Sequence, residues 1–192
     1  ARVRDVGQFV LASTNAVVGN VGEATITERL PLRPLTPYGA TKAACEMLMS
    51  GYAGAYGMTT CALRFSNVYG PGMALKDSFV PRLMRAALDG STVTIYGDGT
   101  QRRDLVHVDD VARAVLLARQ SRYSGTAIVG AGRSVSVLEL VDTVLREISD
   151  TLTKGEAVKI FSFGSFSVRQ KGERIGRNPK TGEAVQLPAK YV

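Results

Sequence analysis

The sequence contains few of the residues that build disulfide-bonded or metal-held proteins. Its 192 residues include only two cysteines, Cys45 and Cys61, together with one histidine and no tryptophan. Two cysteines are too few for a disulfide framework or a metal site, so we expect a reducing compartment and ordinary core positions for both thiols. The sequence therefore predicts no metal centre.

Long hydrophobic runs are also absent. No apolar segment approaches the roughly 20 residues that span a bilayer, and no signal-peptide pattern opens the chain, so we expect a cytoplasmic protein that does not enter a membrane. The first residue is Ala1 rather than methionine, which indicates an N-terminus cut from a longer frame. Hydrophobic residues make up 45% of the chain, enough for one large core or two small ones.

Acidic residues are scarce near the end of the chain. The formal net charge is +7, and residues 165–192 hold six basic and two acidic side chains. A dense basic patch favours a polyanionic partner such as a nucleic acid, although a modest basic excess is also typical of an ordinary solvated surface.

The apolar residues from position 8 to position 129 follow alternating strand and helix patterns. Strands are expected at Gln8–Ser13, Thr59–Arg64, Val93–Tyr96, Leu105–Val108 and Ala127–Val129, and helices at Pro37–Tyr56, Ser78–Asp89 and Asp109–Arg119. Such alternation is typical of an α/β fold with a doubly wound sheet.

A long amphipathic helix is predicted over Ser136–Gly155. Ser136 and Glu139 form a capping box, apolar residues recur at helical spacing, and Gly155 is a natural stop. The pattern then changes to short strands at Val158–Ile160 and Ser165–Gln170, followed by a basic hairpin arm at Lys171–Lys190.

Tyr38 and Lys42 lie four residues apart at the start of a predicted helix, which puts both side chains on one face. A neighbouring ammonium stabilises a phenolate, so a tyrosine in such a pair can take a proton from a sugar hydroxyl while hydride leaves. Taken alone, a tyrosine and a lysine at this spacing are more often an ordinary pair of surface residues than a catalytic pair.

Five segments set this pair in context: Ala12–Gly19, Pro37–Lys42, Leu63–Gly72, Tyr96–Asp110 and Val129–Leu140. They occur in the order seen in extended short-chain dehydrogenases. Over residues 8–147 the chain resembles the NAD-dependent nucleotide-sugar epimerase/dehydratase family, most closely the UDP-glucose 4-epimerases. The resemblance implies a partial Rossmann-like sheet with a substrate subdomain, an NAD cofactor and a UDP-hexose substrate.

The same resemblance implies roles for individual residues. Tyr38 would be the acid/base, Lys42 would bind the nicotinamide ribose and assist Tyr38, and Thr14 would hydrogen-bond the sugar oxygen. Ser66 would lie near the nicotinamide, Asn67 and Arg103 would hold the substrate diphosphate, and Phe79, Val80 and Leu83 would line the nucleotide pocket. The residues by themselves leave simpler alternatives open, namely a helix-capping Thr14, a turn Asn67 and a surface Arg103.

Departures from the family pattern bear on the reaction. The family's sugar 4,6-dehydratases carry an Asp-Glu pair after the catalytic threonine, whereas this chain has Asn15 and Ala16, which favours epimerisation. The family's glycine-rich NAD turn would precede residue 1, so we expect no turnover by this chain alone. Gly130–Val135 begins like such a turn but lacks its third glycine.

Residues 136–192 resemble the HU/integration host factor family of DNA-bending proteins, chiefly through Gly176–Gly182. This implies a partial α+β unit whose arm enters the minor groove, with Pro179 wedged between base steps, while a solvated β-turn is the simpler alternative. Phe163 and Phe166 would be core residues of a homodimer. The DNA-binding residues, within positions 169–190, would be Arg169, Lys171, Arg174, Arg177, Asn178, Pro179 and Lys180.

The sequence thus predicts a chimera-like chain. Residues 1–135 would be the C-terminal part of an epimerase/dehydratase domain, and residues 136–192 a DNA-binding segment. Because either family can use the helix at 136–155, the junction is bracketed only between Arg133 and Ile148. Three functions remain open: a 4-epimerase fragment that is not competent alone, an HU-type DNA-bending protein, and an inactive truncated fusion.

Overall fold

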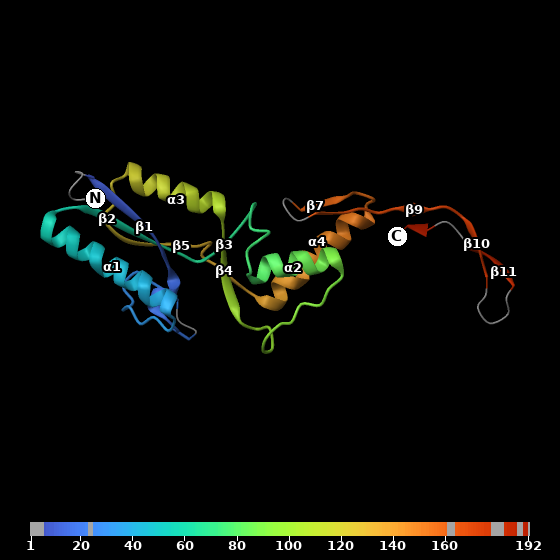
Figure 1. Ribbon diagram of the computed structural model, residues 1–192, viewed down its shortest axis with the longest axis horizontal. Coiled ribbons are helices and arrows are strands. Elements are labelled where there is room, and N and C mark those ends of the chain that lie inside the picture. Colours follow the sequence, from blue (N-terminus) through green and yellow to red (C-terminus); the bar gives the residue numbers. More distant parts are fainter. Residues whose placement is uncertain (1–5, 23–24, 161–163, 178–182, 188–189, 192) are drawn as a thin grey trace. The chain divides into compact units, whose positions relative to one another are not determined.

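The computed structural model describes residues 6–22, 25–160, 164–177, 183–187 and 190–191 (Figure 1). The chain divides into two compact units. Unit 1 comprises Ala1–Pro71 and Gly97–Val137, and unit 2 comprises Gly72–Tyr96 and Leu138–Val192. Each unit thus draws on two separate stretches of sequence.

Unit 1 is built on a parallel sheet. Its strands are β1 (Gln8–Thr14), β2 (Thr59–Phe65) and β5 (Gly125–Val129), in the order β1-β2-β5. Two helices, α1 (Pro37–Tyr56) and α3 (Val108–Gln120), lie on opposite sides of β1 and β2 in Figure 1. The predicted α/β class, with helices on both faces of a parallel sheet, is therefore confirmed.

The central strand β2 presents different chemistry to its two faces. Cys61 and Leu63 pack with Ala118 of α3, whereas Thr60 and Arg64 bond to α1. Cys61 has no exposed surface, and its burial raises the pKa of the thiol above the ordinary value. An ordinary core position, as predicted from sequence, is confirmed for this cysteine.

Helix α1 begins and ends where its sequence predicts. The Thr36 hydroxyl accepts a hydrogen bond from the Gly39 N–H at 3.0 Å, and Pro37 occupies the first turn. Gly57 ends the helix in the left-handed conformation, with φ at 63°. The predicted bounds, Pro37–Tyr56, are those observed.

A second small sheet and a short helix complete unit 1. The sheet joins β3 (Asn67–Tyr69), β4 (Arg102–His107) and β6 (Ser134–Ser136) in the order β3-β4-β6. The 3-10 helix η2 (Asn15–Val18) follows β1 directly, and its Val17 and Val18 pack on Ala43 of α1.

In its described residues, unit 2 contains two helices and short antiparallel strand pairs. The helices are α2 (Phe79–Asp89) and α4 (Val137–Thr153), the latter starting at the last residue of unit 1. The strand pairs are β7 (Val158–Ile160) with β8 (Gly164–Phe166), β9 (Gln170–Lys171) with β12 (Lys190–Tyr191), and β10 (Arg174–Arg177) with β11 (Ala184–Leu187).

Some sequence-based predictions need correction. Val93–Tyr96 forms no strand, because no described strand pairs with it and Tyr96 is 73% exposed. The strand predicted at Ser165–Gln170 is interrupted, and its ends belong to β8 and β9. None of the helices in the described residues is long and apolar enough to cross a membrane.

Candidate functional site

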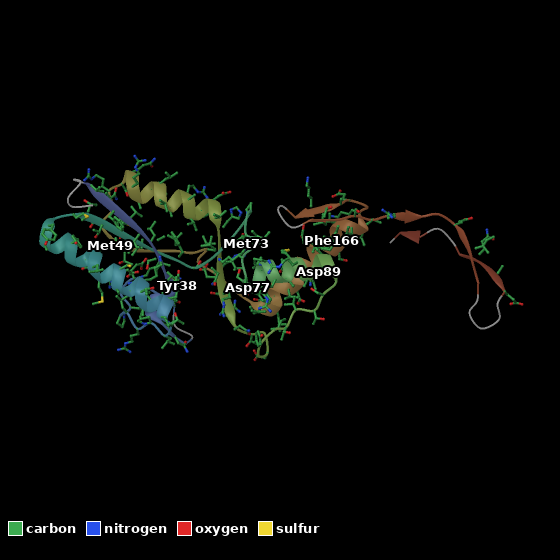
Figure 2. The ribbon with its side chains drawn as sticks, in the orientation of Figure 1. Tyr38, Met49, Met73, Asp77, Asp89 and Phe166 are labelled. Carbon is green, nitrogen blue, oxygen red and sulfur yellow. The ribbon has the colours of Figure 1, made fainter. Side chains whose placement is uncertain are left out.

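Three of the predicted site residues belong to the carboxyl end of β1 and to the start of α1. Lys42 donates a hydrogen bond from Nζ to the Ala12 carbonyl at 2.8 Å, which ties the first turns of α1 to this strand. Tyr38, one turn earlier on the same face, is 57% exposed and therefore accessible to a ligand (Figure 2). Tyr38 and Lys42 thus lie one helical turn apart on α1, and Lys42 reaches the end of β1.

Thr14 is the last residue of β1 and caps η2. Its hydroxyl oxygen accepts a hydrogen bond from the Ala16 N–H at 3.2 Å. This is the capping role that the residue type alone predicts. A threonine hydroxyl also carries a proton of its own, so the cap leaves Thr14 able to donate to a ligand oxygen.

A buried ion pair that the sequence analysis missed lies beneath this end of the sheet. Arg64 of β2 donates to Glu46 of α1 through Nη2 at 2.8 Å and through Nε at 3.1 Å, and the two side chains are only 5% and 6% exposed. Ser13, next to Thr14, donates to the same carboxylate. Glu46 follows Tyr38 and Lys42 at helical spacing, which was the available signal.

A loop carbonyl and a loop carboxylate extend this network. Arg64 Nη1 donates to the Glu28 carbonyl at 3.5 Å, and the Glu28 carboxylate accepts from the Ile128 N–H at 3.1 Å. Hydrogen bonds from the backbone of Glu28 and of Ile128 lower the pKa of the Glu28 carboxyl below its ordinary value. The loop is thereby fastened to β2 and β5.

A second group of predicted residues surrounds Asp104 of β4. Its Oδ1 accepts from Ser66 Oγ at 3.1 Å and from the Ala131 N–H at 2.8 Å, and its Oδ2 accepts from the Gly132 N–H at 3.1 Å. Its backbone carbonyl accepts from Asn67 Nδ2 at 3.1 Å. The N–H groups of Ala131 and Gly132 thus bind an internal carboxylate.

Arg103 precedes Asp104 and is exposed. Its Nη1 donates to the Arg102 carbonyl at 2.9 Å, and it lies opposite Val135 of β6. The surface position that its residue type suggests is the one observed. Exposure also leaves the guanidinium accessible to an anionic ligand.

The predicted pocket residues Phe79, Val80 and Leu83 belong to unit 2, whereas Thr14, Tyr38, Lys42, Ser66, Asn67 and Arg103 belong to unit 1. They lie on α2, where Leu83 is 6% exposed and Phe79 and Val80 are half-buried. Leu83 therefore contributes to the core of unit 2.

Two of the predicted DNA-binding residues, Arg174 and Arg177, lie on strand β10 of unit 2. Strands β10 and β11 pair antiparallel, with Gly176 opposite Val185, which confirms the predicted hairpin. Arg169 is exposed. Lys171 lies in β9, and Arg174 and Arg177 lie in β10. Asn178, Pro179 and Lys180 lie outside the described residues, as does Phe163, which was predicted to be a core residue. Phe166, labelled in Figure 2, is half-buried in β8.

Among the described residues, no group of three histidine, cysteine, aspartate or glutamate side chains is placed to hold a metal ion.

Comparisons with known proteins divide the chain in two. Residues 1–130 match the NAD dependent epimerase/dehydratase family, and residues 131–192 match the family of bacterial DNA-binding proteins. A dTDP-glucose 4,6-dehydratase of Streptomyces griseus is 36% identical over 141 residues, which cover 73% of this chain and 43% of that protein.

Solved structures support the first match. The UDP-N-acetylglucosamine 4-epimerase from Methanobrevibacter ruminantium, in complex with UDP-N-acetylmuramic acid, is 31% identical with a TM-score of 0.70, over 76% of this chain and 49% of that one. MoeE5 in complex with UDP-glucose and NAD is 43% identical with a TM-score of 0.67, again over 76% and 49%. The chain spans about half the length of these relatives.

Proposed function

Because the chain belongs to the NAD-dependent epimerase/dehydratase family and continues into an HU-like DNA-binding segment, we propose that unit 1 carries the acid–base centre of a nucleotide-sugar 4-epimerase. The observation that carries this proposal is the hydrogen bond from Lys42 to the Ala12 carbonyl, which ties the start of α1, where Tyr38 lies one turn before Lys42, to the end of β1 that carries Thr14. Ligands of parallel α/β sheets bind at this end of the strands.

The residues present fit the NAD that the family uses. An ammonium has three hydrogens, and Lys42 gives one to Ala12, which leaves two for ribose hydroxyls. Ser66 lies where β2 leads into β3, and its backbone N–H donates to the Val129 carbonyl at 3.0 Å, which fixes its place at the same strand ends. When bound, the nicotinamide would supply the redox chemistry, by accepting the sugar hydride and returning it to the opposite face of the sugar.

The proton chemistry would belong to this chain. Tyr38 Oη would take the proton of the sugar 4-hydroxyl and later return it, with the Lys42 ammonium stabilising the phenolate. Thr14, whose hydroxyl proton remains after capping η2, would orient the same sugar oxygen. Each step moves one proton between named oxygen atoms and needs no further acid.

Epimerisation is favoured over elimination of water by the residues that follow Thr14. The helix η2 begins with Asn15 and Ala16, neither of which can serve as an acid or a base. The Streptomyces griseus relative is a dehydratase and the Methanobrevibacter ruminantium structure is an epimerase, so similarity alone does not separate the two reactions.

The substrate would be a UDP-hexose. Arg103 presents an exposed guanidinium and Asn67 a side-chain amide, and such groups bind diphosphate oxygens. Catalytic turnover by these 192 residues alone is not expected, since they include no glycine-rich NAD turn. Binding of the sugar nucleotide is therefore the property to measure.

Calorimetric titration of UDP-glucose into the full 192-residue chain is expected to show saturable binding. Replacing Arg103 with alanine should weaken that binding about tenfold, because a charge-assisted hydrogen bond to phosphate is lost. Arg113→Ala, on the exposed face of α3, is the matched control and should leave the affinity unchanged. Absence of binding of both UDP-glucose and NAD by the unaltered chain would refute the proposal.

A second candidate function is favoured by the basic β10–β11 hairpin of unit 2 together with the match of residues 131–192 to bacterial DNA-binding proteins. The hairpin would enter the minor groove and bend the duplex, with Pro179 as the wedge and basic side chains against the phosphates. A homodimer and a domain boundary between Arg133 and Ile148 are further parts of this proposal.

The full chain is expected to retard a nicked duplex in a gel at low salt, with binding that weakens steeply as salt is raised. Replacing Arg177 and Pro179 together by alanine should reduce the affinity about tenfold, since both a phosphate contact and the wedge are removed. Lys154→Ala, just after α4, removes one exposed charge elsewhere in unit 2 and serves as the control. Unchanged mobility of the duplex at low salt would exclude this function.

A further inference from the structure

We propose that Asp104 is a positioning residue that holds Asn67 and Arg103 in the arrangement that binds the substrate diphosphate. The inference rests on the proposed function and adds to it a residue that contacts no ligand itself. Asp104 accepts hydrogen bonds from two parts of unit 1. Ser66 and Asn67 donate from the β2–β3 junction, and Ala131 and Gly132 donate from the loop between β5 and β6.

The Asn67 amide is oriented by this residue. One hydrogen of Nδ2 is given to the Asp104 carbonyl at 3.1 Å, and a side-chain amide has two. The second hydrogen therefore has a fixed direction and is available to a phosphate oxygen. The β3–β4 pairing, which sets Asn67 opposite Leu105, keeps the two strands in this register.

Arg103 is held by a different route. Neighbouring residues of a strand point to opposite faces, so the Asp104 carboxylate and the Arg103 guanidinium do not face one another. The carboxylate charge is met instead by two N–H groups and one hydroxyl. Asp104 thus fixes β4 without neutralising Arg103, and the guanidinium charge remains for the diphosphate.

The loop fits closely around the carboxylate. A Cβ added to Gly130 would lie 2.8 Å from Asp104 Oδ2 and 3.1 Å from Oδ1, too close for an unchanged arrangement. Glycine at position 130 therefore lets the backbone approach the carboxylate. This gives a second way to disturb the contact without changing Asp104.

The test uses the full chain with Asp104→Asn, measured by calorimetry with UDP and by NMR titration with uridine, which lacks the diphosphate. An amide at this position cannot accept from both N–H groups, because its nitrogen is a donor. We expect UDP affinity to fall about tenfold and uridine affinity to stay the same. Gly130→Ala should act in the same direction, and Asp98→Asn, an exposed carboxylate of unit 1, should change neither affinity.

Each other outcome counts against the inference. Unchanged UDP affinity in Asp104→Asn would overturn it, and so would parallel losses for UDP and uridine, which indicate a general structural role. If the unaltered chain binds UDP while Asp104→Asn leaves that affinity intact, only the inference fails. If the unaltered chain binds neither ligand, the proposed function fails first and the inference with it.

Discussion

Replacing Glu46 with glutamine is expected to lower the free energy of unfolding of unit 1 by about 3–5 kcal/mol, because Arg64 is then left as a buried charge without its partner. Glutamine has nearly the same shape as glutamate, so little packing is lost. The measurement is urea unfolding, monitored by the reaction of a thiol reagent with Cys61. This thiol is fully buried in the native state, so its reaction reports on the unfolding of unit 1 alone.

Two further variants test the cause of this loss. Asp110→Asn removes one partner of an ion pair on the surface of α3 and should change stability by less than about 1 kcal/mol. Glu46→Leu combined with Arg64→Met removes both buried charges and should be less destabilising than Glu46→Gln alone. If the double variant has a lower free energy of unfolding than Glu46→Gln, the ion pair contributes net stability, contrary to this explanation.

Replacing Gly39 with alanine is expected to destabilise unit 1 by about 1–3 kcal/mol through overpacking. A Cβ at this position would lie 2.7 Å from the Ala16 carbonyl oxygen and 3.1 Å from Pro34 Cβ. Since Gly39 follows Tyr38 and Ala16 belongs to η2, the clash pushes the start of α1 away from the end of β1. Binding of UDP-glucose should weaken together with stability, and both can be measured on one preparation.

Gly54→Ala is the matched control for this prediction. It lies on the same helix, α1, and a Cβ there meets no atom within 4 Å. Alanine should therefore stabilise the helix by about 0.5–1 kcal/mol, which is the ordinary difference in helix propensity. If both variants destabilise equally, the close approach of α1 to η2 is not the reason for glycine at position 39.

The strongest sequence patterns predicted their elements well. Thr36, Pro37 and Gly57 mark the two ends of α1, and the bounds predicted for this helix are the observed ones. The run at Val93–Tyr96 has the composition of a strand, but a strand also needs a partner, and the local pattern does not contain that information. The three-residue strands β3 and β6 were missed because they are too short to show a period.

The candidate site was predictable where its residues act through local spacing. Tyr38 and Lys42 are one helical turn apart, so the sequence places them together. Glu46 and Arg64 meet across two elements. Helical spacing placed Glu46 on the face of Tyr38 and Lys42, and Arg64 is a charged residue within a buried strand, but neither pattern predicts that the two side chains pair. The contacts of Asp104 join β4 to the β2–β3 junction and to the loop between β5 and β6, and no periodicity predicts such contacts.

The two faces of β2 have a consequence for how unit 1 responds to its solvent. Cys61 and Leu63 meet α3 through apolar contacts, whereas Arg64 meets α1 through a buried ion pair. Excluded salts such as sulfate strengthen apolar burial, and mobile ions screen a buried pair only weakly. Sulfate should therefore stabilise the packing of α3 on the sheet more than that of α1. The choice of cosolvent should then decide which helix dissociates from the sheet first on unfolding.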